Sequence, residues 1–574
     1  MCGICFVLRR NSTGEDGDLN KLYSLLEQAN AARGPDAQIT REVRADHIDL
    51  TFYSSELRLR GDAPVVQPHE GEGNILCWNG EVFDGLNMTA TENDGVKLFE
   101  ALGSLTTAEE VTALFSTLEG PYAFVYYQHR TRHIIYGRDP LGRRSLLVHA
   151  PSGKHPYFIL ASTSAGANPE FEFEELPTQG FFCLSLDELQ TGHGSTAEEV
   201  NDAISVISRT AAKAAPYAAL PSVNCILPPN DPVRLDGLAS NLPPQLAETA
   251  DGLLHHLEDS VRRRVYDIPS PTTTGTARVG VLFSGGIDCT VLALLADKYT
   301  PPGEPIDLLN VAFENPRKMG TGADQNAKKG SRSKPPTSTA SPSQKIAYMV
   351  PDRVTGLEEV EELRRLRPHR IWNFVEVNVP FEETQATRAT IEAIMYPCRT
   401  VMDLSLAQAL YFAARGVGQI RPHKDADPQP YTSRARVLLN GLGSDELLGG
   451  YGRHRTAYNV GGWTALIREL QLELDRLPTR NLGRDDRIIS AHGKEARHPF
   501  LSLDVVRFLA ALPVHAKTNP RLGQGLGDKL LLRIVAWRLG LVEASTRPKR
   551  AMQFGSHSAR MQADSAKKGD LLLD

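Results

Sequence analysis

An apolar run that ends in a glycine pair is the feature that most constrains the fold of this chain. Residues 279–283 read Val-Gly-Val-Leu-Phe, residues 284–288 read Ser-Gly-Gly-Ile-Asp, and helical spacing follows. Strands buried on both faces are continuously apolar, and they occur in parallel sheets covered by helices. Further apolar runs, separated by helical stretches, follow at 308–313, 371–379 and 437–439. This pattern predicts an α/β domain with a mostly parallel, doubly wound sheet.

The first part of the chain has a different pattern, with short strand-like runs rich in β-branched and aromatic residues. The runs lie at 2–8, 49–59, 75–78, 121–127 and 133–136, with Gly, Asn and Asp between them. One helical stretch at 19–33 ends at Arg-Gly-Pro-Asp, where Gly and Pro favour a helix stop and a turn. Residues 1–184 are therefore predicted to form an α+β domain with largely antiparallel sheets.

Length and composition divide the rest of the chain. A chain of 574 residues is expected to hold two or three domains. Residues 185–255 are rich in Ala, Ser and Pro and are predicted to be a connector, and residues 256–556 are the α/β domain. Within that domain, residues 315–345 lack large apolar side chains, so we predict a disordered insertion there. Residues 557–574 are predicted to be a loose tail.

Charge and cysteine usage exclude several classes of function. The formal net charge of −6 gives no basic footprint for nucleic acid or for an anionic membrane. The seven cysteines form no Cys-x-x-Cys pair, which argues against a zinc site and against a disulfide framework. No apolar stretch is long enough to span a bilayer, and no signal-peptide pattern follows the start. We therefore expect a cytoplasmic protein with no membrane or nucleic-acid partner.

The first residues of the chain suggest a nucleophile. Removal of Met1 would leave Cys2 with a free α-amine, whose ordinary pKa of about 7.7–8.0 lets it accept the thiol proton near neutral pH. Asn79 and Gly80 follow a strand-like run, and their side-chain amide and backbone N–H can converge on one oxygen as an oxyanion hole. Any chain can begin with Met-Cys, and Asn-Gly is also the commonest hairpin dipeptide, so both readings remain open.

The glycine pair after residue 283 suggests a phosphate site. Glycines let the backbone close around an anion, and the start of the following helix presents unpaired N–H groups. A second loop, Asn-Gly-Leu-Gly-Ser-Asp-Glu at 440–446, also follows a strand-like run. Asp288 and Asp445 would each give a carboxylate oxygen to Mg²⁺, which prefers such ligands together with phosphates. A simple turn at the glycines and helix capping by the two Asp residues are the alternatives.

The first domain resembles the class II glutamine amidotransferases, whose N-terminal Cys hydrolyses glutamine to glutamate and ammonia. Matching stretches occur in the family's order at 1–4, 33–36, 58–59, 78–81, 93–94 and 137–143. The resemblance implies an αββα fold of the Ntn-hydrolase type. It makes Cys2 the nucleophile, Asn79 and Gly80 the oxyanion hole, and Arg58, Glu81 and Asp94 the residues that hold the glutamine. For Arg58, an ordinary solvated position at a strand end is the alternative.

The second domain resembles the PP-loop ATP-pyrophosphatase domain of the asparagine synthetases, and within that family it matches a divergent branch most closely. Further matching stretches lie at 308–311, 351–352, 492–501, 528–530 and 548–555. The family activates a carboxylate with ATP and lets ammonia displace AMP, so the expected partners are glutamine, Mg²⁺, ATP and a carboxylate acceptor, aspartate or another. The resemblance assigns ATP binding to Leu282, Ser284, Gly285, Gly286, Asp288, Val311, Asn440, Gly441 and Lys529, and metal binding to Asp288 and Asp445.

Three departures from the family pattern bear on function. Cys289 stands where the family has Ser, and a thiol donates a weaker hydrogen bond to phosphate. Asn440 and Leu442 stand where the later loop usually has Ser and Glu, and Leu442 cannot accept a proton or bind ammonium. A glutamine- and ATP-dependent amide ligase is thus the first hypothesis. A pseudoenzyme or scaffold that keeps the fold is the second, and a tRNA-modifying PP-loop enzyme ranks last. A homodimer remains open.

Overall fold

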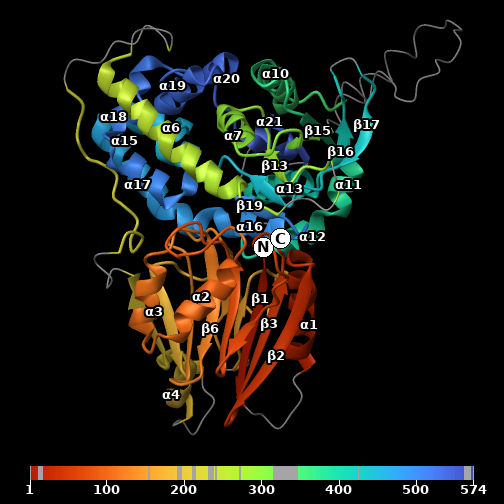
Figure 1. Cartoon of the computed structure of the whole chain (residues 1–574), viewed down its shortest axis with the longest axis vertical. Coiled ribbons are helices and arrows are strands. Elements are labelled where there is room, and N and C mark those ends of the chain that lie inside the picture. The colour runs from red at the N-terminus through yellow and green to blue at the C-terminus, as the bar shows by residue number, and fades with distance from the viewer. Residues whose placement is uncertain are drawn as a thin grey trace, which may run out of the picture.

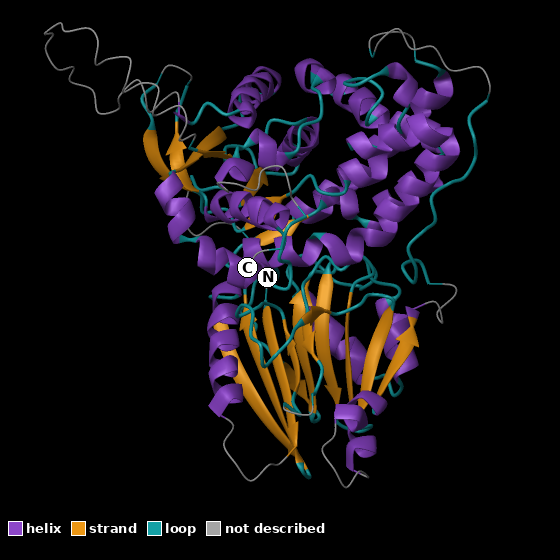
Figure 2. Ribbon diagram, turned by 180° about the vertical axis from the view of Figure 1, so that it is seen from behind, coloured by secondary structure: helices purple, strands orange, loops and turns teal. Residues whose placement is uncertain are grey.

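The computed structural model describes residues 2–10, 17–152, 155–190, 197–209, 215–229, 238, 242–269, 273, 275–314, 347–423, 426–561 and 570–572. The segment 315–345, which the sequence predicts to be a disordered insertion, lies outside the described residues. The described chain forms two parts, one stacked on the other, which are seen from two sides in Figures 1 and 2.

Two antiparallel sheets of six strands build the first part. The first sheet has the order β10 (Glu174–Glu175), β8 (Leu147–His149), β9 (Phe158–Ala161), β1 (Gly3–Arg10), β3 (Ile48–Glu56), β2 (Ala37–Ala45). The second has the order β12 (Ile204–Ser208), β11 (Gly180–Ser185), β7 (His133–Arg138), β6 (Tyr122–Gln128), β5 (Asn74–Gly80), β4 (His69–Gly71). Every pairing in both sheets is antiparallel, as the sequence predicts.

The strands of this part are apolar on both faces because helices cover the outer face of each sheet. In β1, Ile4 and Phe6 face the core between the sheets, whereas Cys5 and Val7 pack with residues of the outer helix. The outer helices are α1 (Gly17–Arg33) on the first sheet and α2 (Asp94–Gly103) and α3 (Ala108–Phe115) on the second. The short helices α4 (Leu186–Gln190) and α5 (Ala197–Asp202) instead pack against the core between the sheets. The resulting order is helix, sheet, sheet, helix, which confirms the predicted α+β class (Figure 1).

A seven-stranded sheet organises the second part. Its order is β17 (Gln429–Thr432), β16 (Val417–Ile420), β15 (Trp372–Val379), β14 (Ile306–Phe313), β13 (Val279–Leu282), β18 (Val437–Leu439), β19 (Glu495–Arg497). The five neighbouring strands β15, β14, β13, β18 and β19 run parallel. Strands β16 and β17 are added at one edge in antiparallel orientation. The chain proceeds from β13 outward to β14 and β15, and later returns to β18 on the other side of β13. The mostly parallel, doubly wound sheet predicted from the sequence is therefore confirmed.

Separate apolar cores lie on the two sides of this sheet. The second part contains helices on both faces. They are α6 (Pro244–Val265), α7 (Ile287–Asp297), α10 (Pro351–Leu366), α11 (Phe381–Ala386), α12 (Arg388–Met395), α13 (Val401–Arg415), α14 (Ser444–Leu448), α15 (Gly452–Arg480), α16 (Leu482–Ser490), α17 (Leu503–Ala511), α18 (Val514–Lys517), α19 (Leu530–Arg538), α20 (Val542–Thr546) and α21 (Met552–Gly555). Three 3₁₀ turns, η2 (Pro499–Leu501), η3 (Pro520–Leu522) and η4 (Ser558–Met561), complete the described elements.

The boundaries differ from those expected. Strand β12 completes the second sheet, so the first part continues to about residue 208 rather than 184. This edge strand is half exposed and Ser-rich, which explains its linker-like composition. At the other end, the prediction of a loose tail is wrong for residues 557–561, because Ser558 and Met561 are buried and η4 packs against α13.

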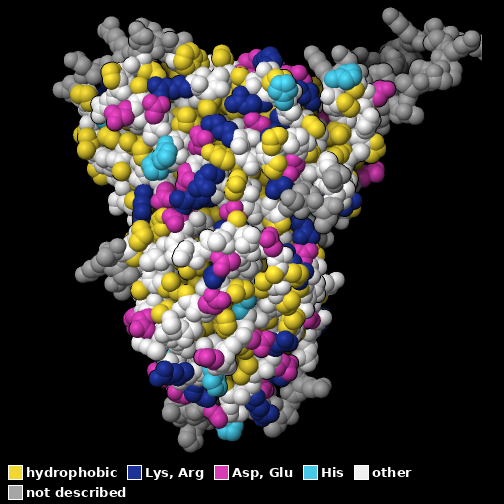
Figure 3. Space-filling model, viewed as in Figure 1, with side chains coloured by type: hydrophobic (Ala, Val, Ile, Leu, Met, Phe, Trp, Pro, Cys, Tyr) yellow, Lys and Arg dark blue, Asp and Glu magenta, His cyan; other side chains and the backbone are white. Residues whose placement is uncertain are grey.

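Within the described residues, no helix has the length and apolar character needed to cross a lipid bilayer. Over the face shown in Figure 3, basic and acidic side chains are interspersed among the described residues.

Buried charges join the two parts, and Asp486 of α16 lies at their centre. Its carboxylate accepts hydrogen bonds from Arg33 at 2.9 Å and from Arg144 at 3.5 Å, both of which belong to the first part. Arg33 also donates to the hydroxyl of Ser490 at 2.6 Å. Burial alone would raise the pKa of Asp486, but the two guanidinium groups lower it below its ordinary value. The carboxylate is thus held ionised between the parts.

The same row of charges continues into the first part. Arg144 pairs with Glu495 at 2.8 Å, and Glu495 pairs with Arg497 at 2.5 Å, both on β19. Arg497 then reaches Glu81 of the first part at 3.1 Å. We use the name charge row for Arg33, Asp486, Arg144, Glu495, Arg497 and Glu81 in this order. Because the signs alternate along the row, each buried charge has an opposite neighbour.

The charge row predicts that removal of the Asp486 charge strongly lowers the stability of the protein. Asp486→Asn leaves Arg33 and Arg144 without their shared carboxylate, so we expect a loss of about 3–5 kcal/mol of unfolding free energy. Because the pKa of Asp486 is lowered in the folded protein, this contribution is present at neutral pH and is lost as the pH falls through the carboxyl range. Urea unfolding at pH 7 measures it.

The matched control is Glu100→Gln, since Glu100 pairs with Lys97 at 3.4 Å on the exposed surface. An exposed pair contributes less than about 1 kcal/mol, so this variant should unfold almost as the unmodified chain does. Equal stability of the two variants would contradict the role of Asp486.

Candidate active sites

Cys2 lies directly before β1, at the junction of the two parts. Its side chain is buried, and its Sγ accepts a hydrogen bond from the side-chain nitrogen of Gln67 at 3.4 Å. Its backbone carbonyl accepts a hydrogen bond from Arg33 at 3.2 Å, so the first member of the charge row contacts Cys2 directly. The pKa of the Cys2 thiol is raised to about 11, chiefly by burial and to a smaller extent by the carboxylates of Glu56 and Asp94, whereas the positive charge of the amino terminus and the backbone N–H of Leu57 lower it. The thiol therefore needs local help to ionise.

Asn79 lies on β5, and its side chain is fully buried. Neither its amide nitrogen nor its amide oxygen has a hydrogen-bond partner within the described part of the chain. A buried amide without partners is destabilising, so this group is suited to a partner that arrives from outside. The following Gly80 has no room for a Cβ because the ring of Trp78 occupies that space. Both features are those expected of an oxyanion hole.

Two buried carboxylates lie beside this strand. Asp94 begins α2 and accepts hydrogen bonds from the Val82 backbone at 2.9 Å and from the Trp78 ring nitrogen at 3.4 Å. Glu81 contacts Arg497 of the second part. Burial raises the pKa of Asp94, and it raises the pKa of Glu81 to about 7 despite the nearby guanidinium groups. The site thus holds two carboxylates that could bind an ammonium group.

Of the two arginines at 58 and 60, Arg60 rather than Arg58 lies beside Glu81. Arg60 lies 3.5 Å from the Glu81 carboxylate and donates to the Val82 carbonyl at 2.6 Å. The side chain of Arg58 is 36% exposed and pairs instead with Glu56 at 3.5 Å. Sequence reasoning missed Arg60, Gln67 and Arg497. Arg58 and Arg60 lie two positions apart, so a shift of the motif alignment by two positions exchanges them.

The glycine loop of the second part follows β13 at the carboxyl edge of the sheet. Gly285 has a φ of +75°, and the backbone of α10 at Thr355 and Gly356 occupies the space of any Cβ there. β13 lies where the strand order reverses, and ligands of open α/β sheets bind in the crevice at this point. A cavity of about 470 Å³ opens there. The predicted residues that line it are Leu282, Ser284, Gly285, Gly286, Asp288, Val311, Asn440, Gly441, Asp445 and Lys529.

Lys529 joins the two predicted metal ligands in this cavity. Its ammonium group lies 2.6 Å from Asp288 and 2.7 Å from Asp445, and it also contacts the hydroxyl of Ser444 at 3.1 Å. Lys549 forms a second ion pair with Asp445. Burial would raise the pKa of Asp445, but the two ammonium groups lower it well below its ordinary value. Lys529 is buried in the cavity rather than exposed on the surface of a helix.

The donor set fits a phosphate-bound Mg²⁺ better than a protein-only metal site. Within the residues that the structure describes, no cluster of three or more His, Cys, Asp and Glu side chains is placed to hold a metal. Asp288 and Asp445 supply two carboxylates, and Mg²⁺ commonly binds one or two carboxylates together with substrate phosphates and waters. Gly441 leaves room for the Asp288 side chain, since a Cβ there would lie 2.9 Å from the Asp288 Cβ.

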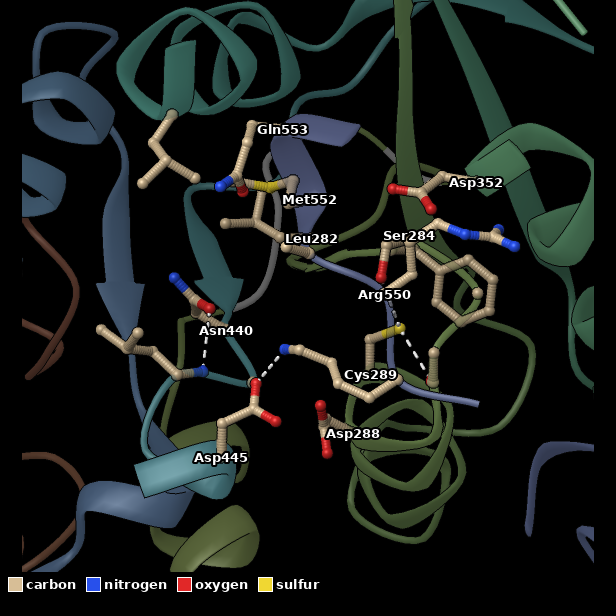
Figure 4. Close-up of a pocket in the computed structure, with 18 of the residues that line it drawn as sticks. Leu282, Ser284, Asp288, Cys289, Asp352, Asn440, Asp445, Arg550, Met552 and Gln553 are labelled. Carbon is tan, nitrogen blue, oxygen red and sulfur yellow. Dashed lines mark hydrogen bonds and ion pairs between the residues drawn. The ribbon is translucent and has the colours of Figure 1, made fainter. Parts of the chain in front are cut away.

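The three residues that depart from the family pattern, Cys289, Asn440 and Leu442, all line this cavity. The Cys289 thiol donates to the Gly286 carbonyl at 3.1 Å, within its own helix, as Figure 4 shows. Leu442 packs against the apolar core, and its backbone N–H donates to the Asn440 side chain at 3.0 Å. Glu446 remains as a carboxyl group lining the cavity, bonded to the Tyr451 hydroxyl at 2.5 Å, and burial raises its pKa.

Further residues lie at the other side of the cavity, where sequence reasoning assigned no ligand. Figure 4 shows Met552 and Gln553 beside Leu282, and Arg550 beside Asp352. Burial raises the pKa of Asp352 to about 7, although Arg550 and Lys549 oppose the shift. The matched stretch at 548–555 was the available signal for these positions.

Comparisons with known proteins agree with this division. The family model "Glutamine amidotransferase domain" matches residues 52–166, and the model "Asparagine synthase" matches residues 458–568. Asparagine synthetase domain-containing protein 1 of Homo sapiens is 37% identical over 636 residues, which covers 99% of this chain and 97% of that protein. The protein of the same name from Bos taurus is 36% identical over 632 residues, with 99% and 97% covered.

A more distant relative has the same extent. Asparagine synthetase domain-containing protein YML096W of Saccharomyces cerevisiae is 31% identical over 569 residues, covering 98% of this chain and 92% of that protein. The likeness therefore extends over both parts, and the resemblance inferred from the motifs is confirmed. The chain belongs to the family of asparagine synthetase domain-containing proteins, in which a glutamine amidotransferase domain accompanies an asparagine synthase domain.

Proposed function

We propose that the chain is a glutamine-dependent, ATP-dependent and AMP-forming amide ligase of the asparagine synthetase type. In this proposal the first part is an Ntn-type glutaminase and the second is a PP-loop synthetase. The observation that carries it is the buried Asn79 amide, which has no partner in the described chain and lies on the strand that Gln67 links to Cys2. A buried amide left unpartnered on the strand that Gln67 links to the thiol is best explained by a substrate oxygen that completes its bonding.

The glutaminase half follows from the positions of these groups. The Cys2 sulfur attacks the side-chain amide carbon of glutamine, and its proton passes to the free α-amine left after removal of Met1. The Asn79 amide and the Gly80 N–H stabilise the developing oxyanion. The protonated α-amine then gives its proton to the amide nitrogen, so that collapse of the intermediate breaks the C–N bond, releases ammonia and leaves a thioester. Water hydrolyses this thioester to glutamate and regenerates the thiol. Glu81 and Asp94 hold the substrate ammonium group.

The ligase half uses the cavity at β13. The 284–286 loop binds the ATP phosphates, Asp288 and Asp445 hold Mg²⁺, and Lys529 neutralises the pyrophosphate as it leaves. Bound Mg²⁺ would supply charge neutralisation for the triphosphate. An acceptor carboxylate, aspartate or another, would attack the α-phosphorus of ATP and displace pyrophosphate. Ammonia would then attack the carbonyl carbon of the resulting acyl-adenylate and displace AMP.

Apolar packing at the junction of the two parts bears on the transfer of ammonia between the halves. Leu57, Leu59 and Leu141 of the first part are buried in the core of the second part. Apolar surroundings disfavour the ammonium ion, which is not a nucleophile, over neutral ammonia. The described junction therefore offers surroundings in which ammonia keeps its reactivity.

The position of Leu442 favours an acceptor other than aspartate, or a synthetase half that has lost its activity. Because Leu442 packs on the core, it offers no group for an ammonium ion or for proton transfer. A pseudoenzyme that keeps the fold is therefore the second candidate. Incubation with glutamine labelled with ¹⁵N in the amide, Mg-ATP and cell extract tests both, because mass spectrometry shows whether the label leaves glutamine and where it goes. Label that stays in glutamine would contradict the ligase.

Cys2→Ser should abolish the release of glutamate from glutamine, because serine is a poorer nucleophile without a strong base. Glutamate is measured by a coupled dehydrogenase assay. The matched control is Cys225→Ser, since Cys225 is exposed and lies outside both sites. Glutamate release by Cys2→Ser at the unmodified rate would overturn the assignment of the nucleophile.

The KM for glutamine should fall as the pH rises through about 7. Burial raises the pKa of Glu81 to about 7, and only its ionised form binds the glutamine ammonium group. Below that pH, KM should rise by up to tenfold per unit. In Glu81→Gln, KM should be higher and should not vary across this range. A flat KM between pH 6 and 8 in the unmodified protein would contradict the role of Glu81.

Lys529→Met should weaken the binding of Mg-ATP at least tenfold, which corresponds to about 1.4 kcal/mol. The substitution removes a buried positive charge from the phosphate side of the cavity. Titration calorimetry measures the binding, and Lys298→Met, which removes an exposed lysine, is the control. Unchanged affinity in folded Lys529→Met would refute the assignment.

A further inference from the structure

The side chain of Gln67 has no role in the reaction as derived above, although it contacts the nucleophile. Gln67 lies just before β4 and is buried. Its amide makes two hydrogen bonds, one to the sulfur of Cys2 at 3.4 Å and one to the backbone nitrogen of Trp78 at 2.9 Å. Both partners belong to the glutaminase site, since Trp78 directly precedes Asn79.

These two bonds fix which end of the amide faces the sulfur. The backbone N–H of Trp78 can only donate, so it requires the amide oxygen of Gln67. The amide nitrogen is thereby directed at Cys2, where it acts as a donor. The orientation does not depend on a choice between two equivalent fits of the amide, because one partner has a fixed role.

A donor at the sulfur favours the thiolate over the thiol. Hydrogen bonds to the charged form of a group stabilise that form, and they are stronger than bonds to the neutral form. The Leu57 backbone N–H acts on the same thiol in the same direction. Burial and the carboxylates of Glu56 and Asp94 act in the opposite direction. An amide does not titrate, so Gln67 can stabilise the thiolate at every pH without competing for its proton.

The second bond of Gln67 acts on geometry. Trp78 lies on β5 in front of Asn79 and Gly80, and its ring stacks on Tyr122 with centroids 5.8 Å apart. One side chain thus connects the sulfur to the strand that carries the predicted oxyanion hole. Attack on a carbonyl requires both groups on the same substrate at once, so the spacing between them limits the rate.

We propose that Gln67 is a further residue of the glutaminase site, which holds the Cys2 thiolate by a hydrogen bond and keeps it in register with Asn79. The part that concerns catalysis rests on the proposed glutaminase function. The part that concerns the thiolate does not, because it can be measured on the thiol alone.

The experiment measures alkylation of Cys2 by iodoacetamide in the full-length protein between pH 6 and 10, followed by mass spectrometry of the N-terminal peptide. Gln67→Met keeps the length of the side chain and removes the donor, and Gln67→Glu places a carboxylate at the sulfur. Each unit of increase in the thiol pKa lowers the thiolate fraction tenfold, and higher nucleophilicity offsets about half of this effect on a logarithmic scale. We therefore expect alkylation at neutral pH at least threefold slower in both variants.

Gln128→Glu is the matched control, because Gln128 is also buried but bonds to the Leu105 carbonyl at 2.6 Å, away from Cys2. Its alkylation rate should equal that of the unmodified chain. Near-UV circular dichroism confirms folding, and if Gln67→Glu does not fold, Gln67→Met decides the outcome. Unchanged alkylation in folded Gln67→Met would overturn the proposal.

Kinetics separate this proposal from the proposed function. In Gln67→Met, kcat for glutamate release should fall at least tenfold while the KM for glutamine stays unchanged, since Gln67 contacts the sulfur and not the predicted substrate-binding groups. If the unmodified protein releases no glutamate although Gln67→Met slows alkylation, the glutaminase function fails and the thiolate contact stands. If glutamate is released and the variant matches the unmodified chain in both assays, only Gln67 loses its role.

Discussion

The ionised carboxylate of Asp486 is the constraint on which the arrangement of this molecule depends. Taking a carboxylate out of water is unfavourable by several kcal/mol unless opposite charges surround it, and here Arg33 and Arg144 of the first part supply them. Neither part alone offers this neutralisation. The two parts are therefore held in one relative position by a requirement for charge balance as well as by apolar packing, and that position places Cys2 next to the second part.

A comparable balance organises the cavity of the second part. Asp288 and Asp445 would repel each other at close range, and the ammonium group of Lys529 lies between them at 2.6 and 2.7 Å. An incoming nucleotide with its cation brings both charges that this arrangement needs. The glycine loop leaves room for phosphate because Gly285 adopts a φ that other residues avoid and packs directly on the α10 backbone.

Much of this could be predicted from the sequence, and the exceptions have physical reasons. Continuous apolar runs identified the parallel sheet because its central strands are buried on both faces. Strand β12 was not predicted because an exposed edge strand needs few apolar residues. The ordered turn η4 was not predicted because Ser556 and Ser558, at its start, are polar residues whose burial is accompanied by hydrogen bonds. Motifs located the loops of both sites. They did not reveal Gln67 or Arg497, since these act through contacts with residues far away in the chain.

The hydrogen bond from Arg33 to the Cys2 carbonyl has a consequence for how the two halves communicate. The same guanidinium group donates hydrogen bonds to Asp486 and Ser490 of α16. A tilt of α16 on ligand binding in the cavity of the second part would move Arg33, and with it the backbone of Cys2, the proposed nucleophile. Nucleotide binding in one part would thus change the position of Cys2 in the other through one side chain, without any rearrangement of the sheets.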